Sequence, residues 1–169
     1  QGYSSLLFHT RKQLVTTTST LSYEGPTLLN NQVEWNAPSL NVRGIWSPLD
    51  KPIERTLLQT PKGSIEWSCL MPRAQATVSQ SDQMLKGFGY IERLTLTIVP
   101  WELPFKELRW GRFLSAHHTL VWIDWRGQMP FTLAFYDGKE CKHTEVADHY
   151  IVLKDEKTVL LFMEPQVIR

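Results

Sequence analysis

The sequence predicts an all-β fold, an antiparallel β-barrel with little helix, from three observations. Short segments rich in Thr, Val, Ile, Leu and Trp recur along the chain between turn residues. A helical apolar period is not sustained in any long window, apart from a weak one at residues 3–15. Many short strands at hairpin spacing favour a sandwich or a closed barrel, and we prefer the barrel because closure removes exposed strand edges.

The expected strands are placed by their β-branched and aromatic residues and by the turns between them. In chain order they are residues 12–22, 32–36, 41–46, 53–59, 64–70, 74–80, 85–99, 108–114, 119–125, 130–137, 142–146, 150–153 and 158–164. Asp137-Gly138 is a strong two-residue hairpin signal. The prolines at 72, 100, 104 and 130 are expected at strand ends or in loops, where a missing N–H does no damage.

Length and charge narrow the possible partners. A chain of 169 residues is expected to form a single domain, residues 1–169. Its formal net charge of +1 gives no field that attracts nucleic acid, so no nucleic-acid partner is expected. No apolar run is long enough to cross a bilayer, so we expect a soluble chain with no transmembrane segment. Residue 1 is Gln, and any targeting segment upstream would lie outside this sequence, so the sequence does not indicate the cellular compartment. It does not indicate the oligomeric state either.

One carboxylate is predicted to lie on the apolar side of a strand. If residues 85–99 are extended, one face carries Phe88, Tyr90, Glu92, Leu94, Leu96 and Ile98. Glu92 is therefore expected to point into the core, where a charged group must be neutralised, paired or used. One possibility is that Glu92 forms a buried ion pair with Arg112 or Arg109. The other is that Glu92 is a protonated acid that donates a proton to a ligand. A nearby Arg112 favours the ion pair, which suits the orientation of a polar ligand head.

Seven Trp residues are a heavy load for a chain of this length. Indoles supply broad apolar walls with one N–H for orientation, which suits a pocket for a bulky hydrocarbon ligand, although core packing is the commoner role. The candidate ligand-binding residues are Trp67, Tyr90, Trp110, Trp122 and, more weakly, His118. The candidate catalytic residues are Glu92, Arg112 and, as a second carboxylate, Asp124.

Motifs for other chemistries are missing from the sequence. Cys141, His143 and Glu145 alternate on one expected strand, but their spacing matches no compact zinc motif, so no metal is expected. The serine-hydrolase elbow, the phosphate-binding loop and the dinucleotide fingerprint are not found either, so no cofactor is expected.

The order of three motifs resembles a known family. They are Val42-Arg43-Gly44-Ile45-Trp46, then Gly63-Ser64-Ile65-Glu66-Trp67, then Gly87-Phe88-Gly89-Tyr90-Ile91-Glu92. Together they resemble the lipocalin-like family that includes carotenoid hydratases, tocopherol-cyclase-like proteins and related natural-product cyclases. The resemblance covers roughly residues 42–127. This chain departs from the family after Glu92, where relatives tend to continue with Asn and Gly.

The resemblance implies a lipocalin-like barrel with a hydrophobic cavity that acts on prenyl, polyene or polyketide-derived molecules without a redox cofactor. It also implies that an acidic residue at Glu92 donates a proton or anchors the ligand. The leading hypothesis is thus a binder of a lipophilic small molecule, as a cofactor-independent cyclase, isomerase or hydratase. A non-catalytic carrier and a packed β interaction module are the alternatives.

Overall fold

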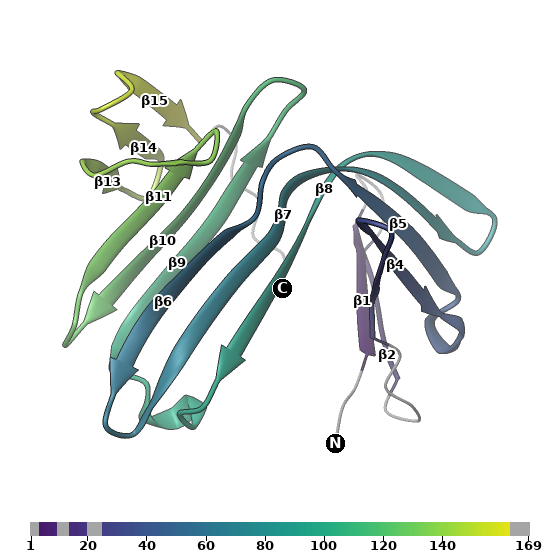
Figure 1. Cartoon of the computed structure of the whole chain (residues 1–169), viewed down its shortest axis with the longest axis horizontal. Helices are drawn as coiled ribbons and strands as arrows, with labels where there is room; N and C mark the ends of the chain where they lie inside the picture. The colour runs from purple at the N-terminus through teal and green to yellow at the C-terminus, as the bar shows by residue number, and fades with distance from the viewer. Residues whose placement is uncertain (1–3, 10–13, 20–24, 163–169) are drawn as a thin grey trace. The chain divides into compact units, whose positions relative to one another are not determined.

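The structure, a computed structural model, describes residues 4–9, 14–19 and 25–162, and its strands pair antiparallel (Figure 1). The strands are β1 (Ser4–His9), β2 (Leu14–Ser19), β3 (Thr27–Leu29), β4 (Gln32–Ala37), β5 (Val42–Pro48), β6 (Ile53–Thr60), β7 (Gly63–Gln80), β8 (Gln83–Leu96), β9 (Phe105–Leu114), β10 (Thr119–Gly127), β11 (Phe131–Tyr136), β12 (Lys139–Glu140), β13 (Thr144–Val146), β14 (Tyr150–Leu153) and β15 (Thr158–Leu161). Helix in these ranges is limited to two 3-10 turns, η1 (Pro38–Leu40) and η2 (Pro100–Glu102).

The all-β, antiparallel class is confirmed. In the described part of the chain, the strand orders β1-β2, β3-β4-β5-β7-β6, β12-β11-β10-β9 and β13-β14-β15 do not close into a ring, so the barrel itself stays a prediction. No helix in those same ranges is long and apolar enough to cross a membrane.

The chain divides into two compact units. The first comprises Gln1–Lys51 and Cys69–Glu92, and the second comprises Pro52–Ser68 and Arg93–Arg169. Strands β7 and β8 contribute residues to both units. The expectation of one domain over residues 1–169 stays a prediction.

The core of the first unit lies on one face of β4, β5, β7 and β8. Val33, Met71 and Ala74 form one buried cluster, against which Trp46 and Ile91 pack. A neighbouring cluster holds Ala37, Leu40 and Val42. Burial of these side chains, at about 25 cal/mol per Å² of apolar surface, provides the main stabilisation of the unit.

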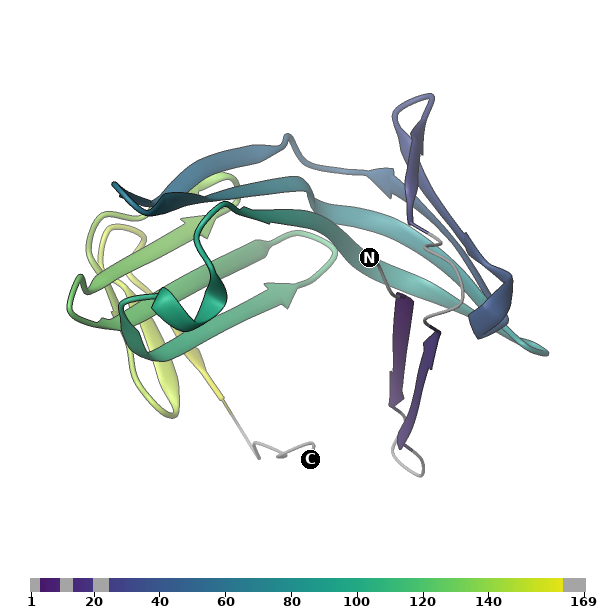
Figure 2. The ribbon, with the colours of Figure 1, turned by 90° about the horizontal axis from the view of Figure 1, so that it is seen from below.

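In the second unit, β10 lies between β9 and β11 (Figure 2), and its side chains from Thr119 to Trp125 are buried on both faces. On one face Trp125 packs with Leu58, Ile65 and Ile98, and on the other Leu120 and Trp122 pack with a cluster on and beside β14. That cluster contains Cys141, Ile151 and Leu153. The clusters and the register divide β10 into two opposing faces, with Leu120, Trp122 and Asp124 on one and Val121, Ile123 and Trp125 on the other, as two-residue alternation requires.

The hairpin predicted from Asp137-Gly138 is confirmed. These two residues have φ values of 49° and 77°, and they join β11 to β12 in register Tyr136 with Lys139. Positive φ at both central residues is what a tight turn between right-twisted strands requires, and Asp-Gly supplies it at low cost.

Two tryptophan rings fill the space above glycines. Gly111 is directly opposite Trp122 in the β9–β10 ladder, and a Cβ added to Gly111 would collide with the indole. In the first unit, added Cβ atoms on Gly44 and Gly89 would collide with the ring of Trp46. Packing a cross-strand aromatic ring over glycine buries the exposed backbone and fixes the ring.

Three sequence expectations are corrected. The weak helical pattern at residues 3–15 belongs to the strands β1 and β2 where the chain is described, because their ladder pairs Leu6 with Thr17 and Phe8 with Val15; residues 3 and 10–13 lie outside the described ranges. The segments 64–70 and 74–80 are one strand, β7, and Pro72 is buried inside it rather than at its end. Pro72 is tolerated because the ladder with β5 begins beyond it, at Ala74.

The third correction concerns the face of β8. Phe88 and Tyr90 are exposed and Glu92 is half-buried, so this face does not enter the core of the first unit. The opposite face does, because Ile91 packs against the Val33 cluster and Gly89 lies beneath the ring of Trp46. Two-residue alternation identified the two faces of β8 correctly but assigned the core to the wrong one.

Replacing Gly111 by Val is expected to lower the free energy of unfolding by about 1–3 kcal/mol, because the new side chain displaces the Trp122 ring. Urea unfolding followed by circular dichroism measures this. Gly87→Ala is the control, since nothing lies within 4 Å of its added Cβ, and it is expected to change the free energy by less than about 0.5 kcal/mol. Equal effects of the two substitutions would contradict the packing argument.

Candidate functional site

A hollow of about 500 Å³ lies in the second unit, beside β9 and β10. It is lined by Leu108, Arg109, Trp110, Trp122, Val146, Ala147, Asp148 and Phe162. All but two of these side chains are apolar, and the two charged ones are of opposite sign. The volume is within the range of small-molecule pockets, about 300–1,000 Å³, but the hollow is open to solvent and not an enclosed cavity.

The aromatic wall of the hollow is held by packing. Trp122 stacks on Phe162 with ring centroids 5.6 Å apart and an interplanar angle of 22°. The other side of the indole is fixed by Gly111, whose missing side chain leaves room for the ring. Position and tilt of the wall are therefore set before any ligand arrives.

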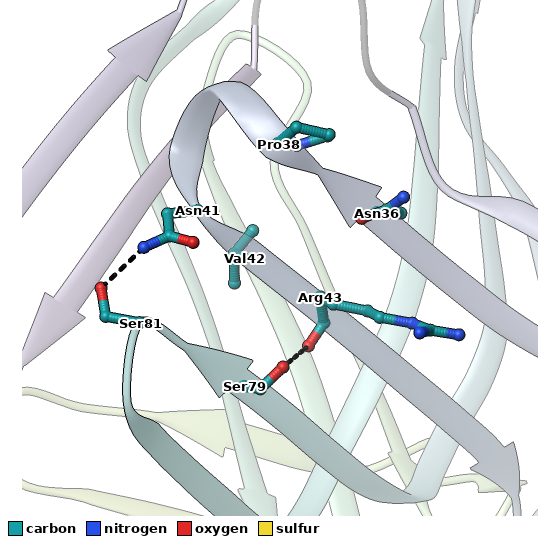
Figure 3. Close-up of a pocket in the computed structure, with 7 residues that line it drawn as sticks. All are labelled: Asn36, Pro38, Asn41, Val42, Arg43, Ser79 and Ser81. Atoms are coloured by element: carbon teal, nitrogen blue, oxygen red, sulfur yellow. Dashed lines mark hydrogen bonds between the residues drawn. The ribbon is translucent and has the colours of Figure 1, made fainter.

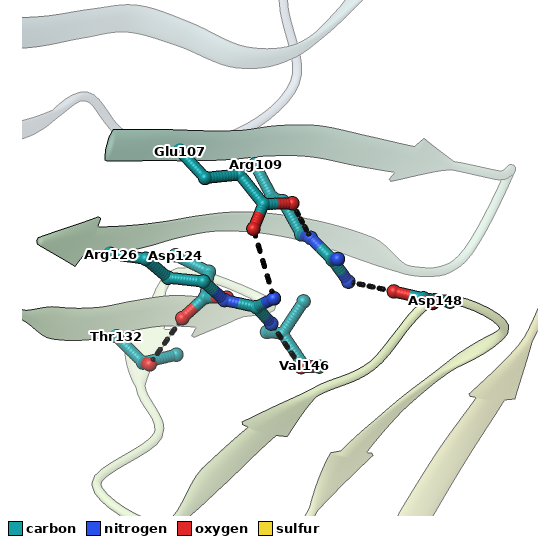
Figure 4. Close-up of polar contacts among 7 residues, drawn as sticks. All are labelled: Glu107, Arg109, Asp124, Arg126, Thr132, Val146 and Asp148. Atoms are coloured by element: carbon teal, nitrogen blue, oxygen red, sulfur yellow. Dashed lines mark hydrogen bonds and ion pairs between the residues drawn. The ribbon is translucent and has the colours of Figure 1, made fainter. Parts of the chain in front are cut away.

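Asp124 supplies a buried carboxylate two residues from Trp122 on β10, and Figure 4 shows its polar contacts. Its Oδ2 accepts a hydrogen bond from Nε of Arg126 at 2.7 Å, and its Oδ1 accepts one from Oγ1 of Thr132 at 2.8 Å. A charge that is 6% exposed requires such partners, because leaving it unpaired costs several kcal/mol. Both oxygens of Asp124 accept hydrogen bonds, and the bond from Nε holds the guanidinium of Arg126 in position, so we call Asp124 the anchor of Arg126.

Arg126 connects this anchor to the border of the hollow. Its Nη2 donates to the backbone carbonyl of Val146 at 3.0 Å, and its Nη1 pairs with Glu107 at 3.3 Å. The contact with Val146 ties the end of β13, and with it the start of the following segment, to β10 (Figure 4).

Arg109 makes a second connection to the same segment. Its Nε lies 2.7 Å from Oε1 of Glu107, and its Nη1 lies 2.5 Å from Oδ1 of Asp148. By donating hydrogen bonds to both carboxylates, Arg109 lowers the pKa of Glu107 and the pKa of Asp148 below their usual values. Both carboxylates therefore stay ionised at neutral pH, which maintains their ion pairs with Arg109 beside the hollow.

Three of the predicted site residues come together here. Trp110 and Trp122 both line the hollow, and Asp124 is two residues from Trp122 on the same face of β10. Trp67 instead is buried in the core, where its ring meets Trp110 edge-on at 5.9 Å and Phe135 at 6.0 Å. Trp67 therefore packs against Trp110 in the core and is not among the residues that line the hollow.

Two other predicted residues of the second unit are not among the lining residues. Arg112 is half-buried on β9, on the strand face that also carries Trp110. His118 is exposed in the loop before β10, with Nδ1 2.8 Å from Oδ2 of Asp137 and its ring stacked on Tyr136. His118 therefore caps a turn.

Glu92 and Tyr90 belong to the first unit, whereas the hollow is formed by residues of the second. The pairing of Glu92 with Arg112 stays a prediction. Arg109, the other arginine considered for Glu92, pairs with Glu107 and Asp148.

A smaller, polar hollow of about 270 Å³ lies in the first unit (Figure 3). Its lining is Asn36, Pro38, Asn41, Val42, Arg43, Ser79 and Ser81. Nδ2 of Asn41 donates to Oγ of Ser81 at 3.0 Å, and Oγ of Ser79 donates to the carbonyl of Arg43 at 3.3 Å. These bonds join the η1 turn and β5 to the end of β7, which is a structural use of the polar groups.

The residues considered for zinc do not form a centre. In the described ranges, no group of three or more His, Cys, Asp or Glu side chains is placed to hold a metal ion. Burial raises the pKa of the Cys141 thiol, which disfavours the thiolate that zinc would need. His143 pairs through Nδ1 with Oδ1 of Asp155 at 2.7 Å.

Sequence reasoning missed much of the border of the hollow, namely Glu107, Arg126, Val146, Asp148 and Phe162. One signal was available: Glu107 and Arg109 have opposite charges two residues apart on a strand, so they share a face. The partners from residues 146–162 depend on how the β13–β15 sheet packs on β10, which alternation does not give.

No family model, curated protein or solved structure matches the chain.

Replacing Asp124 by Asn is expected to destabilise the protein by about 1–3 kcal/mol, because Arg126 then keeps only its longer pair with Glu107 and loses the buried carboxylate. Chemical unfolding measures the change. The matched control is Glu140→Gln, which breaks the exposed pair with Arg55 and is expected to cost less than about 1 kcal/mol. A cost for Asp124→Asn no larger than the control would show that Asp124 is no anchor.

The Asp148 carboxyl is expected to titrate below its usual pKa, and to return towards that value in Arg109→Gln. Because the pKa of the folded state is lowered, the contact stabilises the loop above the usual carboxyl range and is lost as pH falls through the lowered value. Carboxyl carbon shifts in NMR measure both titrations. Arg55→Gln, which removes the partner of Glu140, should leave Asp148 unchanged; identical midpoints in wild type and Arg109→Gln would refute the pairing.

Proposed function

We propose that the protein binds a lipophilic small molecule of prenyl, polyene or polyketide type in the hollow of the second unit. The observation that carries the proposal is a hollow of about 500 Å³ with a fixed aromatic wall and otherwise largely apolar lining. Such a lining gains free energy from each ligand methylene that leaves water, about 0.8 kcal/mol. Arg109 at the border is a donor for a hydroxyl or carboxylate at one end of the ligand.

Binding without turnover is the function that the polar geometry favours. A general acid needs a proton to give, yet both oxygens of Asp124 accept hydrogen bonds from Arg126 and Thr132. The buried carboxylate beside the wall therefore supports a carrier or a sequestering protein. Catalysis by Glu92, with Arg112 as its charge partner, rests on the family resemblance.

The proposal includes the lipocalin-like barrel. It is supported by antiparallel strands that follow one another through short turns, such as β9-β10-β11-β12 in chain order. Meanders of this kind are the building pattern of up-and-down barrels.

Organic extraction of the purified native protein followed by mass spectrometry tests the function. A near-stoichiometric lipophilic molecule is the expected result, and its conversion on incubation with the protein would add turnover to binding. A clean extract from a lipid-rich expression host would instead favour a packed β interaction module.

Filling the hollow is expected to weaken binding without unfolding the protein. Ala147→Phe adds a ring beside Trp122 and Phe162, so the affinity for the fluorescent polyene cis-parinaric acid and for farnesol should fall by at least about tenfold, or 1.4 kcal/mol. Fluorescence titration measures the affinities. Val159→Phe adds similar bulk on the exposed face of β15 and should bind as wild type; equal binding by Ala147→Phe would place the ligand elsewhere.

A further inference from the structure

The turn η2 holds an indole out into solvent. Trp101 is 83% exposed, more than any other large hydrophobic side chain in the described part of the chain. Leaving a side chain of this size in water forgoes about 1.5–3 kcal/mol of burial. An exposed ring of this kind on a structured turn is a candidate contact residue.

The backbone under Trp101 is fixed from several sides. The N–H of Glu102 donates to the carbonyl of Val99 at 3.0 Å, and the N–H of Leu103 donates to that of Pro100 at 3.3 Å. Leu103 packs into the buried cluster of Leu58, Ile65, Ile98 and Trp125. Because Leu103 and Ile98 point inward on either side of it, the intervening turn presents Trp101 outward.

The loop between β10 and β11 brings a further apolar side chain to the same end of the second unit, and the β6–β7 turn lies there too. The N–H of Gln128 donates to the carbonyl of Pro104 at 3.1 Å, and Thr97 bonds to Ser64 beside the β6–β7 turn. We define the apolar tip as Val99, Trp101, Phe105 and Met129, all of them exposed. In Figure 1 the η2 turn lies next to the β6–β7 turn.

The charges around the apolar tip are mainly positive. Lys62 lies 3.3 Å from Glu102, so the carboxylate of the turn is already neutralised by a lysine. Lys106 follows Phe105 directly and is exposed. The apolar tip therefore combines an indole, aliphatic side chains and lysines.

We propose that the apolar tip docks on the surface of an anionic phospholipid membrane, with Trp101 at the level of the headgroups. Indoles favour this interface because one part of the ring is apolar and its N–H is polar. Lys106, which is exposed beside Phe105 and is not used to neutralise Glu102, is attracted by anionic headgroups, at about 1 kcal/mol. A convex turn with a rigid backbone suits shallow insertion of a few side chains, and it loses little conformational entropy on binding. The proposal stands independently of the hollow.

Co-sedimentation of the full chain with vesicles tests the proposal. Vesicles of equal parts phosphatidylcholine and phosphatidylserine should bind the wild type more strongly than phosphatidylcholine alone, and added salt should weaken the binding. Trp101→Ala should lower the partition coefficient by about tenfold. Met84→Ala is the control, since Met84 is 65% exposed but lies on β8 in the first unit, and it should change the coefficient by less than about twofold.

The outcomes separate the possible occupants of the apolar tip. Loss of binding in Trp101→Ala with an unchanged thermal midpoint supports the membrane. Equal binding by wild type and Trp101→Ala, or no binding by the wild type, overturns it. Self-association of the wild type that disappears in Trp101→Ala, without vesicle binding, overturns it in favour of a second copy of the chain.

Discussion

The second unit depends on one buried charge. Asp124 lies in β10, where the side chains from Thr119 to Trp125 are all buried, and a carboxylate there must be paired. Arg126 and Thr132 satisfy it, and Arg126 then reaches the backbone of Val146. The requirement to compensate one carboxylate thus fixes how the loop before β14 meets the central sheet, and with it the border of the hollow.

Local patterns were sufficient for part of this architecture. The Asp137-Gly138 hairpin, the antiparallel class and the opposing faces of β10 follow from turn chemistry and two-residue alternation, which act between near neighbours. The register pairs Trp110 with Ile123, on the face of β10 opposite Trp122, so alternation alone does not explain why both tryptophans line the hollow. Strand pairing and turn chemistry are encoded within short stretches.

The misses share a different physical origin. Which face of β8 is covered, and whether Pro72 interrupts a strand, depend on partners that are distant in sequence. Asp148 and Phe162 join the hollow through the packing of a separate three-stranded sheet, so no local period marks them.

The ring of Trp122 and the bare backbone of Gly111 occupy one shared volume. Side-chain size at either position is therefore constrained by the other, and the free energies of the two single substitutions do not add. A smaller residue at 122 leaves a cavity that a larger residue at 111 partly refills, so the double change is milder than the sum of its parts. The wall of the hollow behaves as a two-residue unit, whose shape can be altered only by changing both members together.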